Sequence, residues 1–164
     1  MELEQALETA YAIMGERTPI RTDCGALCGA ACCLPDEDGQ GGVWLLEPEI
    51  RRVEGAAWAR IDRQADPVAP LLLCREMCER SLRPLCCRVF PLAPVPGRDG
   101  LWTVRMDARA RAMCPLTRSG LKGLDTDFVR AARDALRALA QSGAGEEFLR
   151  AWHDREDAFR RPLW

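Results

Sequence analysis

The chain has 164 residues, a length that fits one domain at roughly 100–200 residues per domain. Hydrophobic residues make up 48% and charged residues 29%, a balance that excludes a wholly disordered chain. The formal net charge of -2, from 23 Lys and Arg against 25 Asp and Glu, gives no electrostatic basis for nucleic-acid binding. We therefore expect one globular domain over residues 1–164 that binds no nucleic acid.

The sequence also predicts a cytoplasmic protein. No apolar run approaches the ~20 residues that span a bilayer. The N-terminal segment is acidic and amphipathic, whereas a secretory signal has a basic stretch followed by an apolar one. We expect no membrane association and a reducing environment.

The first half of the chain predicts two helices around an irregular segment. Apolar residues at helical spacing predict an amphipathic helix that ends before the Thr18-Pro19 step. Residues 20–42 are mostly small and polar and close in a turn-rich stretch at 35–39. A short strand is expected at 43–46, and Pro48 then favours a helix start, with a helix to about Ile61. The apolar positions of the first helix are Leu3, Leu7, Tyr11 and Met14.

The second half predicts a hairpin and two more helices. Residues 89–106 fit a hairpin whose first arm, rich in proline, is an edge strand or extended coil. A helix with Asp125 or Thr126 as N-cap is expected next, with Gly143 as its C-terminal glycine. The apolar face of that helix holds Phe128, Ala132, Leu136 and Leu139, and that of the last helix holds Phe148, Trp152 and Phe159.

These elements predict an α-rich α+β fold. We expect a small, irregular, cysteine-rich core that is held by metal and includes a short hairpin, flanked by amphipathic helices at both ends. The metal-binding region covers about residues 20–116, and the C-terminal helical pair covers about residues 125–161.

Nine cysteines stand against a single histidine. They are about 5.5% of the chain, below the ~8–10% typical of a short disulfide scaffold, and their odd number makes complete internal pairing impossible. In a reducing compartment, clustered cysteines are metal ligands or redox groups more often than disulfides. The cysteine pattern therefore points to thiolate chemistry.

The cysteines form two clusters of four, and Cys114 follows alone. Spacings of two to four residues allow one turn of backbone to present two thiolates to one ion, and a spacing of four places them on one face of a helix. Neighbouring side chains in an extended stretch point to opposite faces, so each vicinal pair implies either two metal centres or one member used elsewhere. The first cluster is Cys24, Cys28, Cys32 and Cys33, and the second is Cys74, Cys78, Cys86 and Cys87.

The ligand type limits the metal. His153 falls in the last helix pattern and is expected at the surface, so the ligands are nearly all thiolates. Thiolates favour zinc, cuprous copper or an iron–sulfur cluster over magnesium, calcium or manganese. Four arginines lie in or beside the second cluster and either donate hydrogen bonds to sulfur or pair with carboxylates: Arg75, Arg80, Arg83 and Arg88.

One segment imitates a calcium loop. Residues 36–47 match such a loop at its first, third, sixth and twelfth positions, but Gln40 stands at the fifth, where Asp or Asn is required. The segment that precedes the loop is not an amphipathic helix. We interpret it as a solvated turn that leads into a strand.

The cysteine segments resemble the CxxCxxCC cysteine-cluster family, the YkgJ-type proteins described as zinc- or iron-chelating. The resemblance covers about residues 20–116. It includes the first cluster, the stretch Arg83–Leu92, which is similar to the family's RPxxCRxFP signature, and Met113-Cys114-Pro115-Leu116. The first cluster here has x₃ spacings where the family name implies x₂, and Cys86 is an additional cysteine beside the signature position, Cys87.

The resemblance implies metal chelation, and one branch of the family includes flagellin lysine methylases with an iron–sulfur cluster. No GxGxxG follows a predicted strand, so the residues themselves do not support methyl transfer from S-adenosylmethionine. The expected ligands, with Cys86 as a further candidate, are Cys24, Cys28, Cys32, Cys33, Cys74, Cys78, Cys87 and Cys114.

Three hypotheses follow. The leading one is a cytoplasmic metal-binding protein that holds zinc, or else an iron–sulfur cluster, in one or two thiolate centres, with a surface that can bind another protein. The second is an iron–sulfur enzyme or accessory protein in protein modification or electron transfer. The third is a thiol redox switch. No catalytic residue is identified.

Overall fold

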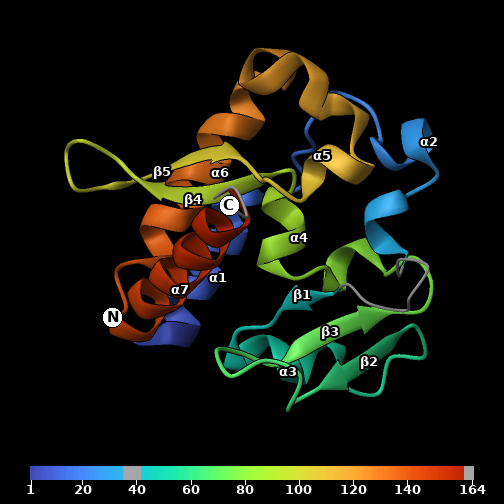
Figure 1. Ribbon diagram of the computed structural model, residues 1–164. Coiled ribbons are helices and arrows are strands. Elements are labelled where there is room, and N and C mark those ends of the chain that lie inside the picture. Colours follow the sequence, from blue (N-terminus) through green and yellow to red (C-terminus); the bar gives the residue numbers. More distant parts are fainter. Residues whose placement is uncertain (35–41, 161–164) are drawn as a thin grey trace.

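The computed structural model describes residues 1–34 and 42–160, and its elements combine helices with two small antiparallel sheets (Figure 1). The predicted α-rich α+β class is confirmed. The helices are α1 (Leu3–Met14), α2 (Gly25–Cys28), α3 (Glu47–Val53), α4 (Leu85–Val89), α5 (Ala110–Met113), α6 (Thr126–Leu139) and α7 (Gly143–Arg160), and the 3-10 helices are η1 (Ala31–Cys33), η2 (Arg80–Leu82) and η3 (Pro115–Gly123). The strands are β1 (Val43–Trp44), β2 (Ala59–Asp62), β3 (Leu71–Cys74), β4 (Leu92–Pro96) and β5 (Trp102–Met106).

The helical body contains the larger of two apolar clusters. Helix α1 packs against α6 and α7, and the hairpin of β4 and β5 packs on α6 and α7 (Figure 1). The expected helix at the N-terminus is confirmed, and its periodic residues Leu7, Tyr11 and Met14 are buried. Asp125 is the N-cap of α6, as the sequence predicts, because its carboxylate accepts hydrogen bonds from the backbone N–H groups of Asp127 (2.9 Å) and Phe128 (3.1 Å).

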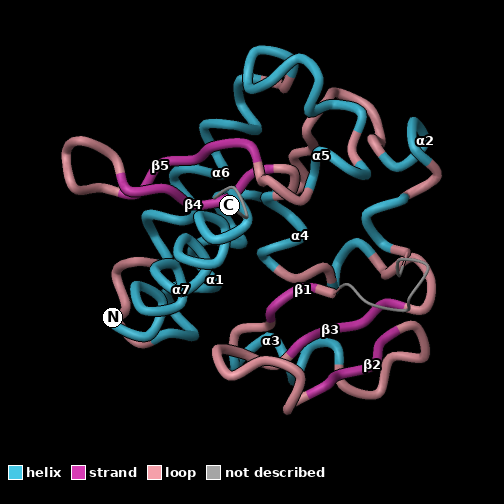
Figure 2. The backbone as a smooth tube through the Cα atoms, viewed as in Figure 1, coloured by secondary structure: helices cyan, strands magenta, loops and turns pink. Residues whose placement is uncertain are grey.

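The smaller apolar cluster joins α3 to a three-stranded sheet of order β1-β3-β2 (Figure 2). Here the predicted helix over 47–61 is wrong in its second half, since α3 ends at Val53 and residues 59–62 form strand β2. Gly55 adopts a positive φ of 84°, which breaks the helix and turns the chain back. Strand β3 is the central strand of this sheet and was not predicted, because its run of three leucines is too short to show a periodicity.

The predicted hairpin forms between β4 and β5, with Leu92 opposite Met106 and Pro96 opposite Trp102. Its first arm is a regular strand despite two prolines, because in a two-stranded sheet one edge of every strand is unpaired. Val89, where the hairpin was expected to begin, is instead the last residue of helix α4.

Two expectations for the C-terminal helices are corrected. Gly143 begins α7 instead of ending α6, and Ser142 stands between the two helices. Phe159 is 57% exposed, so it lies off the buried face that Phe148 and Trp152 share. The expected turn at residues 35–39, and most of the calcium-like loop, lie outside the described residues. No helix in residues 1–34 and 42–160 combines the length and the apolar character that crossing a bilayer requires.

Candidate metal centre

Helix α2 and the 3-10 helix η1 carry the first cysteine cluster and are separated by a left-handed turn. Gly29 (φ 61°) and Ala30 (φ 56°) both have positive φ, a conformation that costs a non-glycine residue about 1–2 kcal/mol. The turn ends α2 before its x₃ spacing can continue. Cys32 and Cys33 therefore do not continue the helical face of Cys24 and Cys28.

Three neighbouring thiols of the first cluster and the distant Cys114 gather around α2. Cys24 interacts electrostatically with Cys28 and Cys114, Cys32 interacts with Cys24 and Cys28, and Cys114 interacts with Cys28. Helix α5, which ends directly before Cys114, packs against η1. We call this group the first thiol set: Cys24, Cys28, Cys32 and Cys114.

The remaining candidate ligands gather at the opposite side of η1. They come from η1 itself, the end of β3, the loop that follows β3, and helix α4. Each of these four thiols interacts electrostatically with every other one. We call this group the second thiol set: Cys33, Cys74, Cys78 and Cys87. The vicinal pair Cys32-Cys33 is thus divided between the two sets.

A chain of hydrogen bonds links the two sets. Arg83 donates to the sulfur of Cys78, the Cys78 thiol donates to Cys33, and the Cys33 thiol donates to Cys32. The bond from Cys33 lowers the pKa of Cys32, which is the exposed cysteine of the first set. Donating to Cys32 and burial together raise the pKa of Cys33.

Burial dominates the acidity of the second set. It raises the pKa of Cys74 to about 11 and the pKa of Cys87 well above its ordinary value. Donation to Cys33, followed by burial, also raises the pKa of Cys78. Thiolates are the metal-binding form, so a bound cation is what would ionise this set near neutral pH.

Arg83 is the cation that faces both sets. It interacts with Cys24 of the first set and with all four members of the second. Its Nε is buried and has no hydrogen-bond partner. A thiolate beside this atom would accept the missing hydrogen bond, because an ionised sulfur is a better acceptor than a thiol.

The other arginines near the second cluster have different partners. Arg80 forms an ion pair with Glu16 at 3.0 Å. Arg88 donates to the backbone carbonyls of Arg83 (2.9 Å), Gly15 (3.1 Å), Arg80 (3.3 Å) and Ser81 (3.1 Å). Both alternatives left open by the sequence therefore occur, since Arg83 donates to sulfur and Arg80 to a carboxylate. Arg88 instead holds the loop that carries Arg83.

Cys86 lies apart from both sets. It is 6% exposed and packs in the apolar core of the helical body. Burial, followed by the negative charge of Glu49, raises its pKa well above the ordinary value. The structure therefore places Cys86 in the core and its neighbour Cys87 in the second thiol set.

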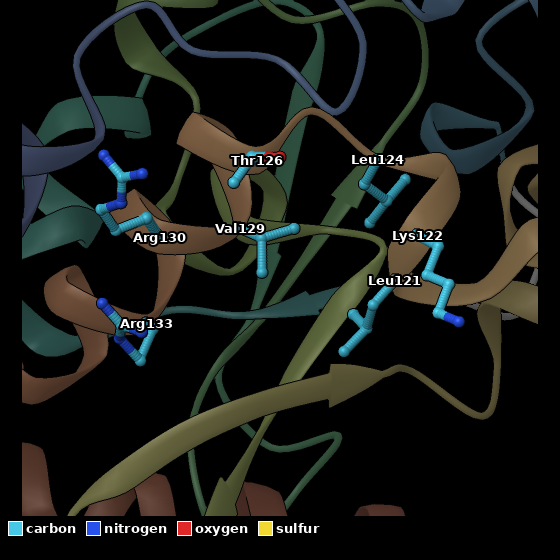
Figure 3. Close-up of a pocket in the computed structure, with 7 residues that line it drawn as sticks. All are labelled: Leu121, Lys122, Leu124, Thr126, Val129, Arg130 and Arg133. Carbon is cyan, nitrogen blue, oxygen red and sulfur yellow. The ribbon is translucent and has the colours of Figure 1, made fainter.

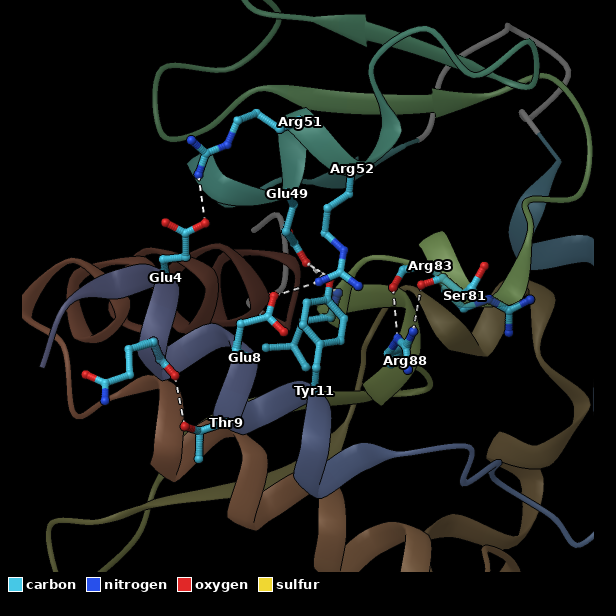
Figure 4. A network of polar contacts seen from close by, with 12 residues as sticks. Glu4, Glu8, Thr9, Tyr11, Glu49, Arg51, Arg52, Ser81, Arg83 and Arg88 are labelled. Carbon is cyan, nitrogen blue, oxygen red and sulfur yellow. Dashed lines mark hydrogen bonds and ion pairs between the residues drawn. The ribbon is translucent and has the colours of Figure 1, made fainter.

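The position of α4 depends on a buried carboxylate that the sequence did not single out. Glu49 is fully buried and accepts a hydrogen bond from the Tyr11 hydroxyl at 2.5 Å (Figure 4). It also accepts hydrogen bonds from Leu46 N (2.9 Å) and Leu85 N (2.7 Å). The guanidinium groups of Arg52 and Arg88 lie 4.3 and 4.7 Å from the Tyr11 ring centroid. The only signal in the sequence was the place of Glu49 in the first turn of a predicted helix, which indicates capping but not burial.

Glu49 connects three segments through these bonds. It links α1 through Tyr11, the start of α3 through Leu46, and the start of α4 through Leu85. Leu85 is the first residue of the short helix that holds Cys87. The apolar body thus fixes one wall of the second thiol set.

The donors fit a thiophilic metal by their chemistry, although the sulfurs do not converge on one point. Among residues 1–34 and 42–160, no three or more His, Cys, Asp or Glu side chains are placed so that they could hold a metal ion as they stand. Four thiols with mutual contacts form the donor set of a closed zinc site or a four-iron cluster. The unpartnered Nε of Arg83 agrees with such a set. Binding would require the four sulfurs to approach one another further.

His153 lies outside both sets. It was expected at the surface, but its side chain is only 18% exposed, so that expectation is corrected. It packs edge-on against Trp102 at 6.2 Å and lies 3.7 Å from a carboxylate oxygen of Asp157. Its role here is in the packing of α7 on the hairpin.

Two cavities differ in what lines them. A small cleft of about 50 Å³ opens at the end of α1 and is lined by Cys24 and Cys32 of the first set and Cys87 of the second. A larger one of about 230 Å³ lies between η3 and α6 and contains no cysteine (Figure 3). Solutes can therefore reach members of both thiol sets through the small cleft.

Comparisons with known proteins do not extend this description. No protein-family model matches the chain, and neither the curated proteins nor the solved structures contain a match. The fold and the candidate site rest on the residues themselves.

Proposed function

We propose that this protein is a cytoplasmic metal-binding protein of the CxxCxxCC type that holds zinc, or an iron–sulfur cluster, in two centres of four thiolates each. The second thiol set carries the proposal, because its four members come from separate segments and each one interacts electrostatically with the others. Cys74 and Cys78 pack against the smaller apolar cluster, but Cys33 and Cys87 belong to neither cluster, so packing does not explain all four thiols.

The residues of the chain have distinct parts in this proposal. Four thiolates on one divalent ion leave a net charge of about -2, and Arg83 offsets part of it beside both centres. Glu49 and Arg88 hold the segments that present Cys87 and Arg83. A bound metal would supply cross-links among η1, β3, α4 and α5, and its binding free energy would contribute to folding.

Metal analysis of freshly purified, reduced full-length protein tests the proposal. We expect stoichiometric zinc, or iron with acid-labile sulfide, and an anaerobic sample that absorbs visible light only in the iron case. Finding neither zinc nor iron in stoichiometric amounts would overturn it. Either metal at one equivalent or more supports metal binding.

Three variants test the division into two centres. Cys78→Ser should remove the metal of the second set, and Cys28→Ser that of the first. Cys86→Ser is the matched control and should retain both metals, because Cys86 lies in the apolar core. Equal metal loss in Cys86→Ser and Cys78→Ser would contradict the division.

A thiol redox switch is a second candidate function, favoured by the exposed Cys32 and its hydrogen bond from Cys33. A peroxide would oxidise the Cys32 thiolate to a sulfenic acid, and its second oxygen would leave as water or alcohol. The Cys33 thiol would then attack that sulfur and release water, which leaves a disulfide. Thiol counts that stay constant under mild peroxide, with metal retained, would exclude this function.

A further inference from the structure

We propose that the small cleft at the end of α1 binds the carboxylate or phosphate group of an anionic ligand next to the thiol sets. The proposal deepens the metal-binding function by naming the class of ligand that reaches the same site. The cleft is lined by three cysteines from both sets, and its other polar side chains are Thr18 and four arginines. These arginines are Arg17, Arg80, Arg83 and Arg88.

Positive charge in the cleft exceeds its compensation. No acidic side chain from residues 1–34 or 42–160 lines it. In the described part of the chain, only Arg80 among the four pairs with a carboxylate, that of Glu16. Arg17 donates to the carbonyls of Ile13 and Met14 at the end of α1, Arg88 donates to carbonyls, and Arg83 donates to a thiol. Arg17, Arg83 and Arg88 therefore have no hydrogen-bonded carboxylate among the described residues.

Four guanidinium groups lie within one small cleft. A cleft lined by one sign of charge concentrates solutes of the opposite sign. An anion at this place would relieve the repulsion among the guanidinium groups.

The arginines also keep hydrogen-bond donors for such a ligand. A guanidinium has five N–H donors in a fixed fork, and Arg17 uses only Nη1. Arg80 uses Nε and Nη2 toward Glu16, which leaves Nη1 free. Arginine forks match the planar or tetrahedral oxygens of carboxylate and phosphate, so these two groups are the expected ligand chemistry.

The volume of the cleft sets the size of the buried group. About 50 Å³ holds one oxyanion group and no larger body, so the rest of the ligand would extend into solvent. The bound group would lie beside the thiols of Cys24, Cys32 and Cys87. A ligand held in this way is placed next to both proposed metal centres.

The test is a calorimetric titration of the full chain, as purified, with inorganic phosphate and separately with malonate at constant ionic strength set by chloride. We expect saturable binding of at least one of them, and the anion that binds identifies the group. Arg17→Gln should weaken it at least tenfold. Arg51→Gln is the matched control, since Arg51 is exposed on α3, pairs with Glu4 and lies outside the cleft, and the charge change is the same.

Two results would overturn the inference: no saturable binding of either anion, or equal affinity in Arg17→Gln and Arg51→Gln. The metal content of the same samples separates this failure from that of the proposed function. If the protein contains metal but binds neither anion, the anion-binding inference is wrong and the metal-binding proposal is unaffected. The cleft arginines would then serve only to offset thiolate charge. Protein without metal that binds an anion through Arg17 overturns the metal proposal and supports the cleft.

Discussion

Substituting Glu49 should destabilise the protein more than its single charge suggests. The carboxylate is fully buried, and its oxygens accept from three donors: Tyr11 Oη, Leu46 N and Leu85 N. Glu49→Ala would leave all three donors without a partner, and each unsatisfied buried donor costs about 1–3 kcal/mol. We expect a loss of about 3–9 kcal/mol, a large part of the about 5–15 kcal/mol that stabilises a domain.

Two milder variants measure how much the individual hydrogen bonds to Glu49 contribute to the free energy of unfolding. Tyr11→Phe removes one donor to a charged acceptor and keeps the ring between Arg52 and Arg88, so it should cost about 1.5–3 kcal/mol. Glu49→Gln keeps one carbonyl oxygen but opposes an NH₂ group to a backbone N–H. In Glu49, Oε1 accepts from Tyr11 and Leu85 and Oε2 accepts from Leu46, so the amide NH₂ of the Glu49→Gln variant would face Leu46 N. We expect this variant to lose about 2–4 kcal/mol of unfolding free energy.

Urea unfolding at neutral pH measures these costs, provided that the slope of the transition is the same in all variants. The double variant completes a cycle, in which Tyr11→Phe should lose most of its cost once Glu49 is alanine. The reasoning is refuted if Glu49→Gln unfolds within about 0.5 kcal/mol of the unsubstituted protein, the spread of ordinary surface changes. Metal content in Tyr11→Phe also shows whether a loosened α4 still presents Cys87.

Three further outcomes are expected. In metal-free reduced protein, iodoacetamide should label Cys32 first and Cys86 last. Cys74 should react slowly, because burial raises its pKa to about 11. Peptide mass spectrometry measures the order of labelling. Arg83→Gln should speed zinc loss to a chelator about 10- to 150-fold, as expected for a lost charge-assisted hydrogen bond of about 1.5–3 kcal/mol, whereas Gln at the exposed Arg75 should not. The third outcome concerns Glu156, whose pKa is raised by burial. The stability that its protonated form contributes is complete below the unfolded pKa of about 4.3 and is lost as pH rises through the folded pKa. Glu156→Gln should remove this part of the pH dependence of stability, which urea unfolding at several pH values measures.

The terminal helices were predictable because their signals are local. The spacing of Leu7, Tyr11 and Met14 and the cap at Asp125 are set by residues within one or two turns of each other. The errors occurred where a boundary depends on tertiary context. The helix expected to reach Ile61 ends at Val53 because the next residues pair with β3, a partner that no local pattern reveals.

The candidate site was predictable in its residue types but not in its grouping. Spacing identified the cysteines and indicated that each vicinal pair must be divided. It did not place Cys114 beside Cys24 and Cys28, because that contact depends on how α5 packs against η1. Nor did it assign Cys86 to the core, since burial of one member of a vicinal pair depends on which face of α4 meets the apolar body.

The two thiol sets are physically coupled, and this determines which variants can separate them. Cys32 and Cys33 are joined by one peptide bond and one hydrogen bond, and Arg83 faces both sets. A substitution at either cysteine or at Arg83 therefore disturbs both sets at once. Cys28 and Cys78 have their contacts within, or mainly within, a single set, so serine at these positions distinguishes two centres from one. If both of these variants lost all metal, the eight cysteines of the two sets would serve one cooperative centre rather than two.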